Sequence, residues 1–175
     1  MPKITRKEPT ARDIELLYEA GRIARNAKEK GNHPFGCLLA DPAGNVLLEA
    51  GNTVVTDHND CGHAETNLMI AASKKYDRDF LAGCSIYTTA EPCVMCTGAV
   101  YWANVRRIVM GFSERDLLEM TGADPENPTF NLPCDEVLSK GQKDFEIVGP
   151  VKDRKLIETL LEEHRGFWKT LITRI

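Results

Sequence analysis

Two short stretches of the chain carry side chains that can bind a transition metal. They are residues 61–65 (CGHAE) and residues 91–96 (EPCVMC). Imidazole and thiolate are first-choice zinc ligands, and three of them, from His63, Cys93 and Cys96, leave the fourth tetrahedral position to water. Zinc sites with an open position are catalytic, because zinc lowers the pKa of water there to about 7. These residues therefore predict one Zn²⁺ that makes hydroxide available at neutral pH.

A carboxylate close to this metal, but not bound to it, completes the predicted chemistry. Hydrolytic removal of an amino group from a ring requires that the nucleophile loses a proton, a ring nitrogen gains one and the amine leaves as ammonia. Glu65, two residues after His63, is the candidate for this proton transfer. Each motif is expected to open a helix, whose positive N-terminal end favours the thiolate form of Cys93 and Cys96.

Several of these residues also admit plainer roles. Cys61 could be a fourth ligand, which would make this a structural zinc site with no open position. In such a site Glu65 would have no catalytic role. A Cys-x-x-Cys pair by itself would equally suit a redox pair or half of a structural zinc site. Ordinary buried or surface positions are expected for the remaining cysteines and histidines, namely Cys37, Cys84, Cys134, His33, His58 and His164.

His-x-Glu followed by Pro-Cys-x-x-Cys is the signature of zinc deaminases that act on bases. The chain also carries HPFG at 33–36, Gly-Asn at 51–52, EPCVMCTGA at 91–99 and YWA at 101–103. With these motifs it resembles the cytidine-deaminase-like superfamily, in the branch of guanine deaminases, fungal-type cytosine deaminases and tRNA adenosine deaminases. The resemblance is strong over about residues 31–111 and looser over the remainder.

The resemblance implies roles for further residues. It implies that Asn52 hydrogen-bonds the base, and that the backbone around Ala64 and Glu91 touches it. It also implies a homodimer in which the C-terminal segment covers a pocket, so Phe167 and Trp168 are candidates to cap the substrate. The remaining substrate-contact candidates are Phe35, Trp102 and Asp124.

The substrate is less well defined by the sequence than the reaction. A free base is the first hypothesis, with a guanine-type purine favoured because YWA and Asp124 resemble the guanine-deaminating branch. Fungal-type cytosine deamination is the close second, and triazines and pterins stay open. A tRNA adenosine deaminase is the next hypothesis, which the acidic charge balance disfavours. A non-catalytic, zinc-stabilised interaction module is the alternative from a different class of protein.

Alternating helices and strands are expected to position the motifs. Capping by Thr10 and Asp13 predicts a first helix that ends near 31, and the turn at 41–44 joins two strands into a hairpin. Alternation of this kind predicts a three-layer α/β/α single domain over residues 1–175, with a mixed sheet of about five strands. The other expected elements are helices from near His63 and Cys93, strands at 35–40, 46–50, 85–89, 107–111 and 145–148, a proline-containing loop at 121–135, and a closing helix with an apolar stripe from Leu156 to Leu171.

Composition narrows the class of protein. The chain has 175 residues, of which 42% are hydrophobic and 27% charged, and a formal net charge of -4. Such values are typical of a globular protein and argue against one whose main task is to neutralise phosphates. No apolar stretch approaches the roughly 20 residues of a membrane helix, and residues 1–10 lack the apolar run of a signal peptide. We therefore expect a cytoplasmic protein.

Overall fold

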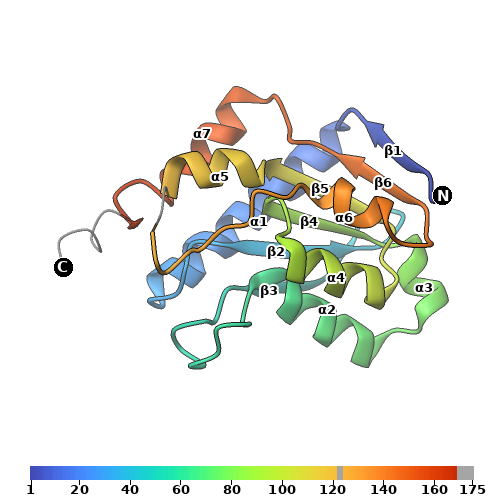
Figure 1. Cartoon of the computed structure of the whole chain (residues 1–175), viewed down its shortest axis with the longest axis horizontal. Helices are drawn as coiled ribbons and strands as arrows, with labels where there is room; N and C mark the ends of the chain where they lie inside the picture. Colours follow the sequence, from blue (N-terminus) through green and yellow to red (C-terminus); the bar gives the residue numbers. More distant parts are fainter. Residues whose placement is uncertain (122–123, 169–175) are drawn as a thin grey trace.

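A computed structural model describes residues 1–121 and 124–168 and contains a six-stranded sheet with helices on both faces (Figure 1). The strands are β1 Ile4–Lys7, β2 Gly36–Ala40, β3 Val46–Gly51, β4 Ser85–Ala90, β5 Arg107–Phe112 and β6 Phe145–Val148. The helices are α1 Ala11–Glu29, α2 Ala64–Lys75, α3 Arg78–Gly83, α4 Val94–Ala103, α5 Glu114–Thr121, α6 Cys134–Ser139 and α7 Arg154–Glu162. Among these helices, none is both long and apolar enough to cross a membrane.

The sheet is mixed, with the strand order β1-β6-β5-β4-β2-β3. The four strands β1, β6, β5 and β4 are parallel to one another, whereas β2 pairs antiparallel with both β4 and β3. The β2–β3 pair is the predicted hairpin. Because β4 and β5 are parallel neighbours, the segments that follow them leave the sheet at the same edge, where ligands commonly bind in open α/β sheets.

Each face of the sheet packs against its own set of helices, which confirms the predicted three-layer arrangement. One core cluster joins α2, α4 and α6 to the sheet, and Leu68, Val100 and Leu138 are fully or almost fully buried in it. The other joins α1, α5 and α7 to the opposite face, with Leu17 and Leu160 among its members. The motif helices α2 and α4 therefore lie in one layer, side by side (Figure 1).

The structure has one strand more than the five expected. The additional strand is β1, whose sequence Ile-Thr-Arg-Lys is short and mostly polar and so shows no strand pattern. It pairs with β6 at the edge of the sheet. Three short helices, α3, α5 and α6, were also not predicted, since six to eight residues hold too few turns to show an apolar periodicity.

The closing helix is shorter than expected. α7 ends at Glu162, so His164 and Trp168 lie in the turns that follow it. Leu171, the last residue of the predicted apolar stripe, lies outside the described residues. The predicted loop at 121–135 is confirmed over 124–133, while its ends belong to α5 and α6.

Candidate metal and active site

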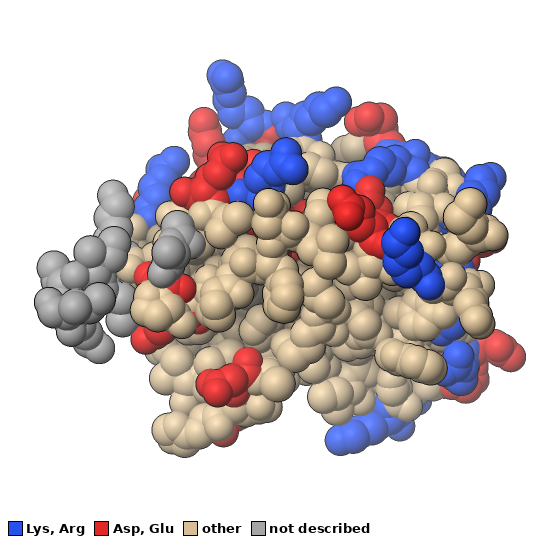
Figure 2. Space-filling view, in the orientation of Figure 1, with Lys and Arg blue, Asp and Glu red and all other residues tan. Residues whose placement is uncertain are grey.

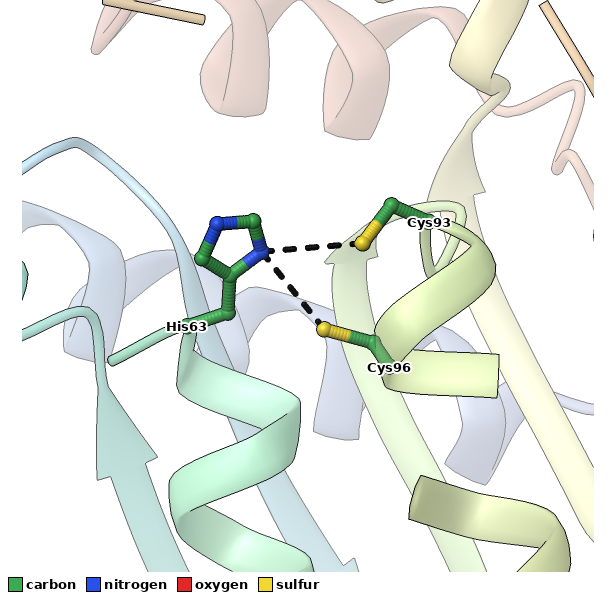
Figure 3. Close-up of side chains that lie close together, drawn as sticks. All are labelled: His63, Cys93 and Cys96. Carbon is green, nitrogen blue, oxygen red and sulfur yellow. Dashed lines mark hydrogen bonds between the residues drawn. The ribbon is translucent and has the colours of Figure 1, made fainter. Parts of the chain in front are cut away.

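The two motif helices begin facing each other, and their first residues form a metal-ligand cluster. His63 is the N-cap of α2 and Cys93 is the N-cap of α4, with Cys96 in the first turn of α4. His63 Nδ1 lies 3.6 Å from Sγ of Cys93 and 3.6 Å from Sγ of Cys96, and all three side chains point to one centre (Figure 3). Tetrahedral zinc with ordinary bond lengths places nitrogen and sulfur ligands about 3.5 Å apart. The cluster therefore fits zinc.

The charge state of the cluster also favours a cation. Hydrogen bonding from Cys96, helped by His63, lowers the pKa of the Cys93 thiol to about 4. The same contact with Cys93, together with burial, raises the pKa of Cys96. Two sulfurs in contact, one of them already a thiolate, are the arrangement that a divalent metal stabilises by binding both.

Cys61 does not join this cluster. Its side chain is exposed, and the metal-binding group found among the described residues consists of His63, Cys93 and Cys96. The structure thus supports three protein ligands and does not support the closed, four-ligand alternative.

Glu65 lies in the first turn of α2, beside the cluster, and is almost completely buried, with 5% of its surface exposed. Burial, followed by the negative charge of Cys93, raises the pKa of its carboxyl. Oε1 of Glu65 lies 2.8 Å from the hydroxyl of Thr88, which is also 3.0 Å from the carbonyl oxygen of Ala90. When Thr88 donates its single proton to that carbonyl, its oxygen accepts from a protonated Glu65. Thr88 therefore holds Glu65 in either protonation state.

A cavity of about 830 Å³ opens over the cluster. This is ample for a small heterocycle, because ligand pockets commonly measure about 300–1,000 Å³. His63, Cys93 and Glu65 form part of its lining, and residues 125–130 of the loop after α5 form another part.

Three of the predicted substrate contacts line this cavity: Phe35, Asn52 and Glu91. Oδ1 of Asn52 accepts a hydrogen bond from the Val54 backbone, so its amide NH₂ remains to donate toward the cavity. The Glu91 carboxylate, in contrast, is used by the fold, because Oε1 accepts from the Cys134 backbone and Oε2 from the Glu114 backbone.

The other three predicted contacts are not part of the cavity lining. Ala64 is fully buried at the start of α2, and Asp124 is buried just before the lining loop. Trp102 lies near the end of α4 with 72% of its surface exposed. Within a single chain, the structure brings Trp102 to the surface rather than to the site.

The two C-terminal aromatic candidates lie behind the lining. Trp168 is buried, and its ring meets His33 at 5.2 Å and Phe35 at 6.2 Å between centroids. Phe167 also contacts His33. His33 and Phe35 both line the cavity, so the end of the described chain supports the pocket wall.

The sequence reading missed Glu114, which also lines the cavity. It is the first residue of α5, and 3% of its surface is exposed. Burial, followed by the charges of Cys93, Glu65 and Glu91, raises the pKa of its carboxyl to about 8. No local motif marks Glu114. Its only indication in the sequence is its place two residues after β5, comparable to Glu91 directly after the neighbouring parallel strand β4.

A three-layer α/β/α domain with an open His-Cys-Cys cluster beside a buried glutamate defines the class of zinc-type deaminases. The comparison with protein families agrees: residues 10–112 match the model described as the cytidine and deoxycytidylate deaminase zinc-binding region. The chain belongs to this family, and zinc is its metal.

Relatives from several branches of the family are similar to this chain. A probable cytosine deaminase of Schizosaccharomyces pombe is 36% identical over 162 residues, which cover 92% of this chain and 95% of that protein. A tRNA-specific adenosine deaminase of Bacillus subtilis is 37% identical over 99 residues, covering 57% and 61% of the two chains. A solved structure of guanine deaminase from Nitrosomonas europaea superposes with a TM-score of 0.68 at 24% identity, covering 91% and 87%, and so supports the fold.

Proposed function

We propose that this protein hydrolytically deaminates a free nucleobase or a closely related amino-heterocycle, with cytosine the first candidate and a guanine-type purine the second. The observation that carries the proposal is the position of Glu65, which is buried beside a three-ligand metal cluster and lines a cavity large enough for a base. A structural zinc site has no need of such an acid.

The chain's own residues divide the reaction between them. Zinc, held by His63, Cys93 and Cys96, supplies an activated water as nucleophile when it is bound. Glu65 would carry one proton from the attacking water to the ring nitrogen and the second proton of that oxygen to the amine, which leaves as ammonia. The raised pKa of Glu65 suits this task, because a carboxyl that holds its proton more tightly is a better base. Asn52 orients the base through its amide.

The charge of the cavity favours a base without phosphate. Among the described residues, the lining includes Asp60, Glu65, Glu91, Glu114 and Glu126 but neither Lys nor Arg. A nucleotide or an RNA backbone would bring negative charge toward these carboxyls without a cation to pair with. On the face shown in Figure 2, Lys and Arg are interleaved with Asp and Glu and do not gather into a basic patch. We therefore rank tRNA below a free base as the candidate substrate.

Cytosine ranks before guanine for two reasons. The guanine preference rests on YWA and Asp124, and neither Trp102 nor Asp124 lines the cavity. The similarity to the probable cytosine deaminase, in contrast, extends over nearly the whole of both chains.

The test is ammonia release from a panel of cytosine, guanine, adenine, isocytosine, triazines, pterins, cytidine and a tRNA anticodon hairpin. We expect cytosine or guanine to be deaminated and Glu65→Gln to lose at least about 100-fold in kcat, since general acid–base catalysis contributes roughly 10²–10⁴-fold. Zinc content should remain at the wild-type level, which separates lost chemistry from a lost site. Unchanged ammonia release by Glu65→Gln would contradict the role of Glu65 in proton transfer. A wild-type protein inert toward the whole panel would support the interaction module instead.

We also propose a homodimer, as the family resemblance implies, and we retain the cytoplasmic location as a prediction. The exposed side chains of Trp102 on α4 and Ile70 on α2, at 72% and 51%, are apolar surface that a second copy could cover. Light scattering of the purified protein should give twice the chain mass, and Trp102→Glu should reduce it. A monomer at micromolar concentration would contradict the dimer.

A further inference from the structure

Glu114 stands out among the buried acids of this protein. Within the described residues six carboxyl side chains are buried: Asp13, Glu65, Glu91, Glu114, Asp124 and Glu163. Five of the six have a hydrogen-bond or ion-pair partner for the side chain. Glu114 is the exception, because its backbone N–H is engaged by Glu91 and its carboxyl oxygens have no partner among the described residues.

The unpaired carboxyl faces the cavity rather than the core. Glu114 lines the cavity. Its carboxyl oxygens are not fully enclosed by protein, unlike the buried, unpaired side-chain atoms of Thr121, Asp124 and His164. It lies near Cys93, Glu65 and Glu91, close enough for their charges to act on it. An unsatisfied carboxyl in such a place costs free energy, which a ligand that supplies a donor can recover.

We propose that Glu114 is a specificity residue that accepts a hydrogen bond from an N–H group of the bound base. This proposal rests on the proposed function and narrows its substrate class. Asn52 offers an amide donor, and Glu114 keeps an acceptor oxygen whether or not its carboxyl is protonated. The pair therefore selects a base that carries both a carbonyl oxygen and an N–H group. Cytosine and guanine satisfy this requirement, whereas adenine lacks the carbonyl.

The first measurement separates recognition from chemistry. In a Glu65→Gln background, which cannot complete the reaction, the dissociation constant of cytosine is measured by calorimetry with and without Glu114→Ala. Loss of a hydrogen bond to a buried carboxyl predicts binding weaker by at least about tenfold. Glu119→Ala, an exposed glutamate on the same helix, is the matched control and should bind as the parent does. Zinc content and Tm report whether each variant still folds.

The second measurement identifies the group that Glu114 recognises. For an otherwise wild-type enzyme, Glu114→Ala should raise KM by at least about tenfold and change kcat by less than about threefold. Wild type should discriminate against a base in which the recognised ring N–H carries a methyl group. Glu114→Ala should lose most of that discrimination, since the acceptor is gone and space is created.

The outcomes distinguish the two proposals. If wild type deaminates bases and Glu114→Ala matches it in Kd, KM and discrimination, the role of Glu114 is wrong while the proposed function stands. If wild type neither binds nor deaminates any base, both are wrong. A lower Tm with unchanged KM assigns Glu114 to stability alone and also overturns the proposal.

Discussion

The carboxylate of Glu91 shows how closely structural and chemical residues are mixed at this site. It accepts the backbone N–H of Glu114 at 3.0 Å and that of Cys134 at 2.8 Å, and thereby holds the first residues of α5 and α6. α5 begins at the cavity with Glu114, so Glu91 positions the wall that carries Glu114. The predicted contact of Glu91 with the substrate stays a prediction. Its backbone N–H donates to the carbonyl of Phe112 at 2.8 Å, so its own backbone carbonyl is the group left to make that contact.

Replacing Glu91 by Ala should destabilise the protein by about 2–4 kcal/mol, because each of two buried N–H groups loses its acceptor. Unfolding in urea measures the change. Glu91→Gln keeps one acceptor oxygen in the same place and should lose less than Glu91→Ala. A loss of unfolding free energy below about 0.5 kcal/mol in both variants would show that water replaces the carboxylate. The two hydrogen bonds that Glu91 accepts would then contribute little to stability.

Residues that act through sequence-local motifs could be predicted, and those that act through the fold could not. His63 and Glu65 are two positions apart, and Cys93 and Cys96 three, so their chemistry is readable along the chain. Glu114 comes 18 residues after Cys96, and nothing in its neighbourhood marks it as chemical. It reaches the site because β4 and β5 are parallel neighbours.

At the scale of elements, the close packing of α1 on the sheet requires a glycine at position 36 of β2. A Cβ on Gly36 of β2 would collide with the backbone of Ala20, Ile23 and Ala24 in α1. Since backbone cannot swing aside as a side chain does, the helix would have to move. α1 packs on β2, and Phe35, next to Gly36, lines the cavity.

Gly36→Ala should therefore cost about 1–3 kcal/mol in unfolding free energy, the usual cost of overpacking. Gly98→Ala is the control, because a Cβ at position 98 meets nothing within 4 Å. This substitution also replaces a glycine inside helix α4 by a better helix former. The control should be neutral or stabilising by up to about 1 kcal/mol. Equal stability of the two variants would mean that α1 shifts without cost.

Long elements with a clear period were predictable, and short ones were not. The capping box of Thr10 and Asp13 begins α1 as predicted, and β6 has the predicted bounds 145–148. The closing helix was predicted too long, because an apolar stripe continues through His164 and Trp168 while the backbone has already turned. Those two aromatic residues are buried by the pocket wall and not by a helix face.

At the scale of the whole molecule, His164 links stability to pH. Burial lowers the pKa of its ring to about 3, while Nδ1 accepts from the Trp168 indole 3.1 Å away. Between pH 6.5 and 3 the unfolded chain protonates this histidine and the folded chain does not. The stability that neutral His164 contributes is thus present above about pH 6.5 and is lost as the pH falls, by up to about 1.4 kcal/mol per unit.

His164→Gln removes the titrating ring and keeps an acceptor for Trp168. When the pH falls from 6.5 to 5, the unfolding free energy of wild type should therefore decrease by about 2 kcal/mol more than that of this variant. Urea unfolding at matched pH values measures it, and zinc loss at low pH affects both proteins alike. A difference that does not change with pH would mean that His164 titrates normally and is not sealed in the fold.

The layered architecture and the metal cluster could be read from the sequence, whereas the shape of the substrate cavity could not. The cavity is assembled from His33 before β2, Glu114 after β5 and the loop at 125–130, which are brought together by the sheet order. No local sequence pattern predicts that these segments lie next to one another. For the same reason the guanine preference, drawn from motifs near Trp102 and Asp124, is weaker than the assignment of the reaction.

The central claim is a zinc ion held by three side chains with one position left open. X-ray absorption at the zinc edge of the purified protein tests it most directly. We predict one zinc per chain with two sulfurs at about 2.3 Å, one imidazole nitrogen, and a light-atom ligand that survives Cys61→Ser unchanged. Three sulfurs in wild type, reduced to two by Cys61→Ser, or protein without zinc would contradict the account.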